Sequence, residues 1–301
     1  MRRNNDDRSA GGNRRGRPDR TSAAGSGVAR PARRLPEALA RLARRYSCIL
    51  RYGARNQLIY LRSFIMRNFF LIIILFVMHR LWRVILADGP IVGFTLVQML
   101  WYLAVTEAIE LSRGRLFQDI QDDVRTGAVV YTLARPYPYP AFEFTRWFGG
   151  AVVRLVPLLA IGFVSALALV GPLPRFAYGI SLALPSIVLG LAIGTLWVLL
   201  IGLLAFWSED VTPFYWIYQK IVFIFGGMFL PIDYFPEWLA AISRVLPTAF
   251  QAYWPARLAV APDAALAMTT YAGQLVWIAG LAGACALLFA AATKRMHAHG
   301  G

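Results

Sequence analysis

Six apolar runs, each about as long as a membrane span, constrain this chain more than any other feature. They cover residues 64–86, 91–111, 147–170, 178–206, 214–232 and 266–292. About 20 apolar residues in a helix cross the ~30 Å hydrocarbon core of a bilayer, so the pattern predicts six transmembrane helices. The composition agrees, because 58% of the 301 residues are hydrophobic, against roughly 45–50% in soluble domains. The chain is therefore predicted to be an all-α polytopic membrane protein.

The distribution of basic residues predicts how the spans are oriented. An even number of spans places both termini on the same side of the membrane. If that side is the cytoplasm, 24 of the 31 Lys and Arg residues flank the spans on the cytoplasmic side and five lie outside. Cytoplasmic loops of membrane proteins carry the excess of basic residues. We therefore expect cytoplasmic N- and C-termini.

The N-terminal part of the chain divides into two segments before the first span. Residues 1–33 are Arg-rich and almost free of apolar side chains, which predicts a disordered cytoplasmic tail; contact with anionic lipid headgroups or RNA is the alternative. In residues 34–62, apolar side chains recur every three or four positions among arginines. This pattern predicts an amphipathic helix along the inner leaflet, or else a cytoplasmic helix packed on protein. Residues 63–296 then form the six-span domain, and 297–301 a short cytoplasmic tail.

A short amphipathic helix is predicted between the second and third spans. Leu116, Ile120 and Val124 share one helical face. Asp119, Asp122, Asp123 and Arg125 occupy the remaining faces, Gly127 offers a stop, and Arg135-Pro136 favours an extended exit. On the cytoplasmic side this helix is either a docking element for another protein or a charged connector.

The segment after the fifth predicted span is interrupted by glycine and proline. The span reaches Gly226-Gly227, and Pro231, Pro236 and Pro247 follow. Hydrocarbon tolerates non-helical backbone only where protein or a water-lined cavity satisfies its polar groups. Six aromatic residues of the segment suit the outer membrane interface; they are Tyr234, Phe235, Trp238, Phe250, Tyr253 and Trp254. Residues 236–247 are predicted to form a short helix that lies at or dips into the outer leaflet.

Charged residues in or near the spans are candidates for function, because each costs roughly 2.5–3.5 kcal/mol at a helix centre. Glu107 and Glu110 fall near the cytoplasmic end of the second span, Arg154 lies deeper in the third, and Lys220 lies in the inner third of the fifth. We expect the glutamates to reach the interface, Lys220 to extend inward, and Arg154 to pair with Glu107 or Glu110. That pair could be structural or a proton relay. Gly190-x-x-x-Gly194 in the fourth span permits close helix approach.

Motifs for catalysis are missing from the sequence. The chain has no Gly-Lys pair, so it lacks the G-x-x-x-x-G-K-[ST] loop that holds ATP phosphates. It also lacks a Cys/His metal-ligand set and a recognisable nucleophile motif. We therefore expect no enzyme activity, cofactor or metal in this chain. No nucleic-acid partner is expected either, because 13 of the 31 basic residues lie in the first 45 positions, so the net charge of +15 belongs mostly to the tail. Any ATP and Mg²⁺ would be bound by a partner subunit.

Two stretches resemble the permease subunits of type-2 ABC exporters, in the bacterial "ABC-2 family transporter" branch. The stretch IQDDVRTGAVVYTLARPYPYP is similar to that branch through Ile120, Gly127, Leu133, Arg135 and Pro136. The second stretch, QKIVFIFGGMFLPIDYFPEWLAAISRVLPTAF, is similar through Gly226, Gly227, Phe229, Pro231, Pro236, Trp238, Leu246 and Pro247. The resemblance covers residues 35–296.

The resemblance implies that transport and ATP hydrolysis are carried out by different subunits. A permease of this kind forms a dimer with a second copy or a related chain in the bacterial inner membrane, carries two separate ATPase subunits, and exports a small amphipathic, drug-like or lipid-like cargo. Residues 119–127 would be the ATPase-coupling element, with Leu116, Arg135 and Pro136 beside it, and residues 231–247 the external gate, together with Gly226, Gly227 and Phe229. The principal rival is an ATP-independent secondary transporter or channel, which needs a buried ion relay. A membrane enzyme or scaffold would need clustered polar catalytic groups.

Overall fold

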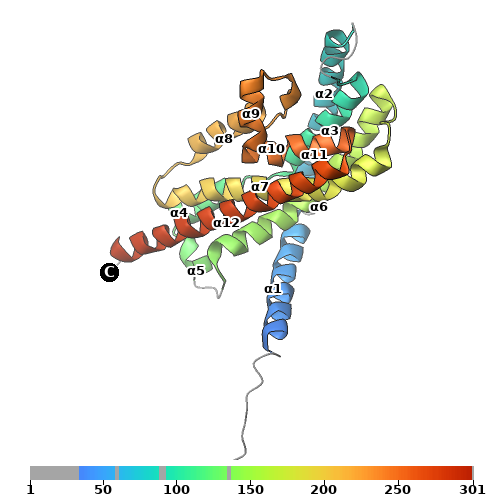
Figure 1. Ribbon diagram of the computed structural model, residues 1–301. Helices are drawn as coiled ribbons and strands as arrows, with labels where there is room; N and C mark the ends of the chain where they lie inside the picture. Colours follow the sequence, from blue (N-terminus) through green and yellow to red (C-terminus); the bar gives the residue numbers. More distant parts are fainter. Residues whose placement is uncertain (1–33, 58–60, 88–92, 134–136, 300–301) are drawn as a thin grey trace, which may run out of the picture. The chain divides into compact units, whose positions relative to one another are not determined.

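The computed structural model describes residues 34–57, 61–87, 93–133 and 137–299, and all of their regular elements are helical (Figure 1). The chain divides into two units, Met1–Arg41 and Leu42–Gly301, and every contact below lies within the second. The predicted N-terminal tail falls outside the described residues. The longer helices are α1 (Arg34–Gln57), α2 (Leu61–Ile85), α3 (Leu96–Ser112), α6 (Tyr139–Val170), α7 (Phe176–Leu203), α8 (Thr212–Phe225) and α12 (Ala264–His299). The shorter ones are α4 (Leu116–Arg125), α5 (Val129–Leu133), η2 (Leu204–Phe206), η3 (Ile232–Tyr234), α9 (Glu237–Val245), α10 (Pro247–Gln251) and α11 (Tyr253–Val260).

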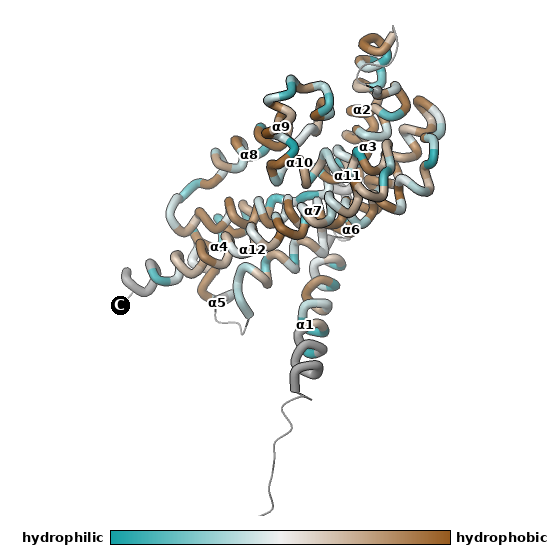
Figure 2. The backbone as a smooth tube through the Cα atoms, viewed as in Figure 1, coloured by the Kyte–Doolittle hydropathy of each residue, from teal (hydrophilic) through white to brown (hydrophobic). Residues whose placement is uncertain are grey.

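Among the residues that the structure describes, four helices are long and apolar enough to cross a membrane: α2, α6, α7 and α12. Figure 2 shows the apolar residues that run along them. On α2, α6 and α12 less than half of the apolar stretch is buried, whereas on α7 most of it is buried. Apolar surface exposed along a span is surface that lipid can cover. The chain is therefore a multi-pass membrane protein, and four of the six predicted spans are helices of sufficient length.

The second predicted span corresponds to α3, which is shorter than expected. It begins at Leu96 rather than near residue 91, because Thr95 and Gln98 form a capping box. The Thr95 hydroxyl accepts the Gln98 N–H at 3.2 Å, and the Gln98 side chain accepts the Thr95 N–H at 3.0 Å. The resulting 17 residues are roughly 25 Å long at 1.5 Å per residue.

The fifth predicted span corresponds to α8, which contains 14 residues and is roughly 21 Å long. It ends at Phe225 instead of continuing to residue 232. Gly226 follows as the C-cap, and Gly227 has a φ of +66°, a left-handed conformation that favours glycine. The chain turns there, so α3 and α8 do not meet the length of a full span and the number six stays a prediction.

Side-chain contacts fix the directions of neighbouring helices. α3 and α6 are antiparallel, since Trp101 near the start of α3 bonds the Gly171 carbonyl after the end of α6, and Arg154 bonds the Ser112 carbonyl at the end of α3. α7 and α12 are parallel. Their hydrogen bonds advance together along both helices, from Tyr271 to Leu182, Gln274 to Ser186 and Cys285 to Leu196. α7 is the central helix, with contacts to α12, α11, α4, α6 and α10.

The helices predicted outside the spans are present, while their placement at the membrane stays a prediction. α4 begins at Leu116 and ends before Gly127, whose φ of +74° supplies the predicted stop. α9 lies between Pro236 and Pro247, as the proline spacing predicted. The amphipathic helix predicted for residues 34–62 is α1, and Gly53 lets it approach α6 closely: a Cβ at Gly53 would lie 1.9 Å from the Arg146 carbonyl oxygen.

Candidate functional site

The apolar face of α4 is buried within this chain. Leu116 and Ile120 are fully buried and Val124 is half-buried. They pack on the last turns of α7, where Gly202 leaves the space: a Cβ at Gly202 would lie 2.8 Å from the Ile120 Cδ1 and 3.2 Å from the Phe117 Cα. α7 therefore covers the apolar face of α4. Another protein cannot bind that face without displacing α4.

Two further contacts attach α4 to the start of α8. The Phe117 ring stacks on Tyr215 with centroids 4.1 Å apart. The Gln121 side chain accepts the Val211 N–H at 2.8 Å, so it satisfies one of the backbone donors that a helix N-terminus leaves free. α4 is therefore held against both α7 and α8.

The face of α4 that remains exposed is acidic. Asp119, Asp122 and Arg125 are exposed and Asp123 is half-buried. An Asp119 carboxylate oxygen lies 3.6 Å from Arg146 of α6. Partial burial raises the pKa of Asp119 and Asp123 above the usual aspartate value, and the charge of Arg146 opposes the rise. Arg135 and Pro136, which were predicted to shape the exit from this region, lie outside the described residues.

Arginine side chains cap the buried C-terminal end of α3. Arg67 donates to the carbonyls of Leu111 (2.9 Å) and Arg113 (3.0 Å). Arg154 donates from Nε to the Ser112 carbonyl at 2.7 Å. The last carbonyls of a helix lack partners within the helix and carry partial negative charge, so cations stabilise them. The end of α3 is fixed by α2 and α6 at the point where the chain leaves for α4.

The prediction that Arg154 pairs with Glu107 or Glu110 is wrong. Glu110 forms its ion pair with Arg113, and Glu107 is buried without an ion pair in the part of the chain that the structure describes. Arg154 instead bonds a main-chain carbonyl, because α3 ends at Ser112 and presents its terminal carbonyls to α6. A proton relay between Arg154 and a glutamate, the feature that a secondary transporter would need, receives no support from this geometry. Lys220 is exposed on α8, and its extension toward the cytoplasmic side stays a prediction.

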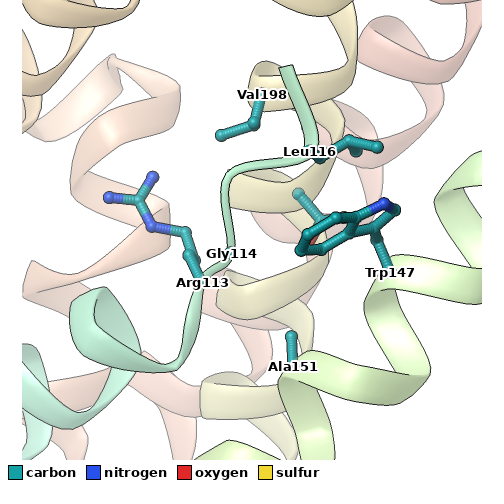
Figure 3. A pocket seen from close by; sticks show the side chains of 7 residues that line it. Arg113, Gly114, Leu116, Trp147, Ala151 and Val198 are labelled. Carbon is teal, nitrogen blue, oxygen red and sulfur yellow. The ribbon is translucent and has the colours of Figure 1, made fainter. Parts of the chain in front are cut away.

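The linker from α3 to α4 is shown in Figure 3. The Trp147 ring lies against Gly114, where a Cβ would be 2.0 Å from the ring. Arg113 extends to the other side of the linker, away from Trp147 (Figure 3). A cavity of about 10 Å³ lies among these residues, which is room for about one water molecule. The linker is therefore packed on both sides.

The residues predicted as an external gate fall into two groups. Gly226, Gly227, Pro231 and Pro247 are buried. The Tyr102 hydroxyl of α3 donates to the Gly227 carbonyl, so the turn after α8 lies inside the bundle. The outer group consists of Phe229, Pro236 and Trp238. In this group Pro236 and Trp238 are exposed, while Phe229 is half-buried and stacks on Phe223 of α8.

After α9, the chain returns into the bundle as α10 and α11, here called the inserted segment (residues 247–260). Two glycines of α7 admit its backbone. A Cβ at Gly190 would lie 2.5 Å from the Gln251 carbonyl oxygen, and a Cβ at Gly179 would lie 2.3 Å from that of Ala259. Gly190 is about 14 residues into α7, so the inserted segment reaches roughly 21 Å along that helix.

The inserted segment corrects one sequence interpretation. Tyr253 was predicted to lie in the aromatic belt at the outer interface, but it is buried, and its hydroxyl donates to Asp233 at 2.9 Å. Asp233 also pairs with Arg257 at 2.8 Å. Aromatic composition alone does not separate an interfacial ring from a core ring with a polar partner. Trp238, by contrast, is 67% exposed, as a ring at the interface would be.

Comparison with known proteins identifies the family. The family model described as "ABC-2 family transporter protein" matches residues 63–300, which is most of the chain. The chain belongs to the ABC-2 transporter family. Among curated proteins and among solved structures, no match was found. The matched region of this ABC-2 protein contains α4, the capped end of α3 and the inserted segment, and the resemblance noted in its sequence is confirmed. The protein is an ABC transporter permease.

Proposed function

We propose that this permease is driven by a separate ATPase subunit that binds the acidic face of α4. The observation that carries the proposal is the division of α4 into a face buried on α7 and an exposed face with Asp119 and Asp122. A helix seated in this way can transmit force to α7 and, through the linker, to α3. The chain has no P-loop, so ATP and Mg²⁺ would be bound by that subunit.

The wider assembly follows the family. We propose a dimer with a second copy or a related permease, two ATPase subunits, and a place in the bacterial inner membrane. The transporter would export a small amphipathic, drug-like or lipid-like cargo. Closure of the ATPase pair would push the α4 helices and rock the spans. Gly226, Gly227 and the residues around Pro231, Pro236 and Pro247 would then act as the outer gate.

The parallel packing of α7 and α12 supports six crossings. Two parallel spans both run from the same side of the membrane to the other, so the chain between Phe206 and Ala264 must return across it. In this region α8 begins beside the end of α7 and leads back toward the inserted segment, although it is short. We therefore propose α3 and α8 as the second and fifth spans, with both termini in the cytoplasm.

This topology predicts which positions an impermeant thiol reagent reaches from outside. In a Cys48→Ser background, Glu237→Cys on α9 should be labelled in intact cells, because Glu237 is exposed on the proposed outer face. Asp122→Cys on α4 should be labelled only after the membrane is permeabilised. Labelling of Asp122→Cys in intact cells, or protection of Glu237→Cys, would contradict the orientation.

The ATPase contact predicts a charge effect on α4. Asp122→Lys should weaken co-purification of the ATPase subunit about tenfold, because it places a cation where the partner meets an acidic face. Asp122 is exposed, so the fold should be unaffected. Glu237→Lys makes the same change of charge at the exposed start of α9 and should leave the complex intact. Equal recovery of the ATPase with both variants would rule out α4 as its binding site.

A further inference from the structure

A buried polar chain joins three segments that are far apart in the sequence. Arg113 follows the end of α3, Tyr218 lies in α8, and Gln251 ends α10. Arg113 donates from Nη1 to the Tyr218 hydroxyl. That hydroxyl donates to the Gln251 side-chain oxygen at 2.7 Å. These three residues are here called the polar relay.

The polar relay lies in the interior. Arg113 is 6% exposed, Tyr218 5% and Gln251 0%. Glu110 balances the charge of Arg113, and the guanidinium also lies over the Tyr218 ring, 5.4 Å from its centroid. A buried polar group that loses its partner is strongly unfavourable. The three side chains therefore move together or pass to a second paired arrangement.

α7 is shaped to admit the polar relay. A Cβ at Gly194 would lie 2.8 Å from the Arg113 Cδ and 3.1 Å from the Gln251 Cδ. No side chain of α7 can separate the two residues at this level. Gln274 of α12 adds a second attachment of the inserted segment, since it donates to the Phe250 carbonyl at 2.9 Å.

The position of Arg113 links the relay to α4. Only Gly114 and Arg115 separate Arg113 from the first residue of α4. Helix shifts in switching proteins are about 1–2 Å, and a hydrogen bond is lost once its donor–acceptor distance exceeds about 3.5 Å. A shift of α4 would thus break the relay unless Tyr218 and Gln251 follow.

We propose that the polar relay carries movement of α4 to the inserted segment and through it to the outer gate. This inference rests on the proposed function, because it assumes that an ATPase moves α4. Arg113, Tyr218 and Gln251 would be positioning residues: they contact neither nucleotide nor the ATPase. Neither the sequence spacing nor the family resemblance marks these three residues.

The test follows the outer gate while ATP is added. The reporter is Trp238→Cys in a Cys48→Ser background, reconstituted in liposomes with the ATPase that co-purifies with the tagged chain. The rate of labelling by an impermeant maleimide is measured with and without ATP and vanadate. In the parent, ATP should change the rate. Tyr218→Phe should reduce the ATP-dependent change about fivefold or more, because the phenyl ring keeps its stack on Trp197 but cannot join Arg113 to Gln251.

Matched variants separate a relay from a merely structural role. Tyr215→Phe removes a hydroxyl that bonds Gln219 on the same helix, outside the polar relay, and should retain the response. Gln251→Glu keeps an acceptor for Tyr218 and should also retain it, whereas Gln251→Leu should lose it. If Tyr218→Phe does not fold, the comparison of Gln251→Glu with Gln251→Leu tests the polar relay in its place.

The outcomes distinguish this inference from the function on which it rests. If no ATPase co-purifies with the parent, the proposed function fails and the relay with it. If the ATPase binds but ATP leaves labelling of the parent unchanged, α4 does not drive the gate and the relay is refuted. If Tyr218→Phe and Gln251→Leu respond to ATP as the parent does, the relay alone is refuted.

Discussion

Gly190→Leu is expected to lower the free energy of unfolding by about 3 kcal/mol or more, since inserting side-chain atoms into a packed interior typically costs 1–3 kcal/mol even without a backbone collision. Here the nearest atoms are backbone. A Cβ at Gly190 would lie 2.5 Å from the Gln251 carbonyl oxygen and 3.3 Å from that of Phe250. Rotation of a side chain cannot relieve these contacts. The inserted segment would have to leave α7, taking Gln251 out of the polar relay.

Thermal unfolding of the purified protein in detergent measures this effect, with an expected fall in Tm of about 5 °C or more. Gly280→Leu is the matched control, because Gly280 lies in α12 with no atom within 4 Å of a Cβ there. It should unfold within about 1 °C of the parent, as surface substitutions usually do. If Gly190→Leu is as stable as Gly280→Leu, the inserted segment does not occupy its described position.

The glycines of α7 illustrate what the sequence could and could not predict. Gly190-x-x-x-Gly194 predicted a close approach, and one occurs. The motif predicted the close approach of a helix, and the nearest atoms that approach belong to the last residue of the short helix α10 and to the side chain of Arg113 in the linker. A small residue indicates that another segment approaches the helix closely, but it does not identify that segment. The helix that approaches comes from about 60 residues later in the chain.

The amphipathic pattern of α4 was predictable for a related reason. Local periodicity places Leu116 and Ile120 on one face whatever lies opposite. The sequence therefore predicted the helix and its buried face. It did not predict that α7 covers this face, because the contact at Gly202 depends on where the two helices lie in the bundle.

Charged and polar residues were harder to assign. Arg154 was paired with a glutamate because a buried arginine needs a partner, but a helix end offers carbonyls that serve as well. Those carbonyls became available only because α3 ends at Ser112. Arg113, Tyr218 and Gln251 lie 105 and 33 residues apart along the chain. One observable signal was a glutamine and a tyrosine in otherwise apolar stretches, which must find partners when buried.

Gly202→Leu should detach α4 from α7 and abolish recovery of the ATPase. Leucine at this position would extend into the space that Ile120 and the Phe117 backbone occupy. The apolar face of α4 would then have to move away from α7. We expect at least about a tenfold loss of co-purified ATPase. A detached α4 would have to become ordered when the ATPase binds, and this cost would weaken binding by more than about 1.4 kcal/mol.

Limited trypsin digestion tests the same change without an ATPase. Arg115 precedes α4 and Arg125 is its last residue, and cleavage there should accelerate in Gly202→Leu because a detached helix opens more often. Gly283→Leu in α12 is the control, since no atom lies within 4 Å of a Cβ at Gly283. If Gly202→Leu is digested like the parent and recovers the ATPase fully, the contact with α7 at Gly202 does not hold α4 in place. Faster cleavage with undiminished ATPase recovery would show that the ATPase binds elsewhere, because it would bind a chain whose α4 is loose.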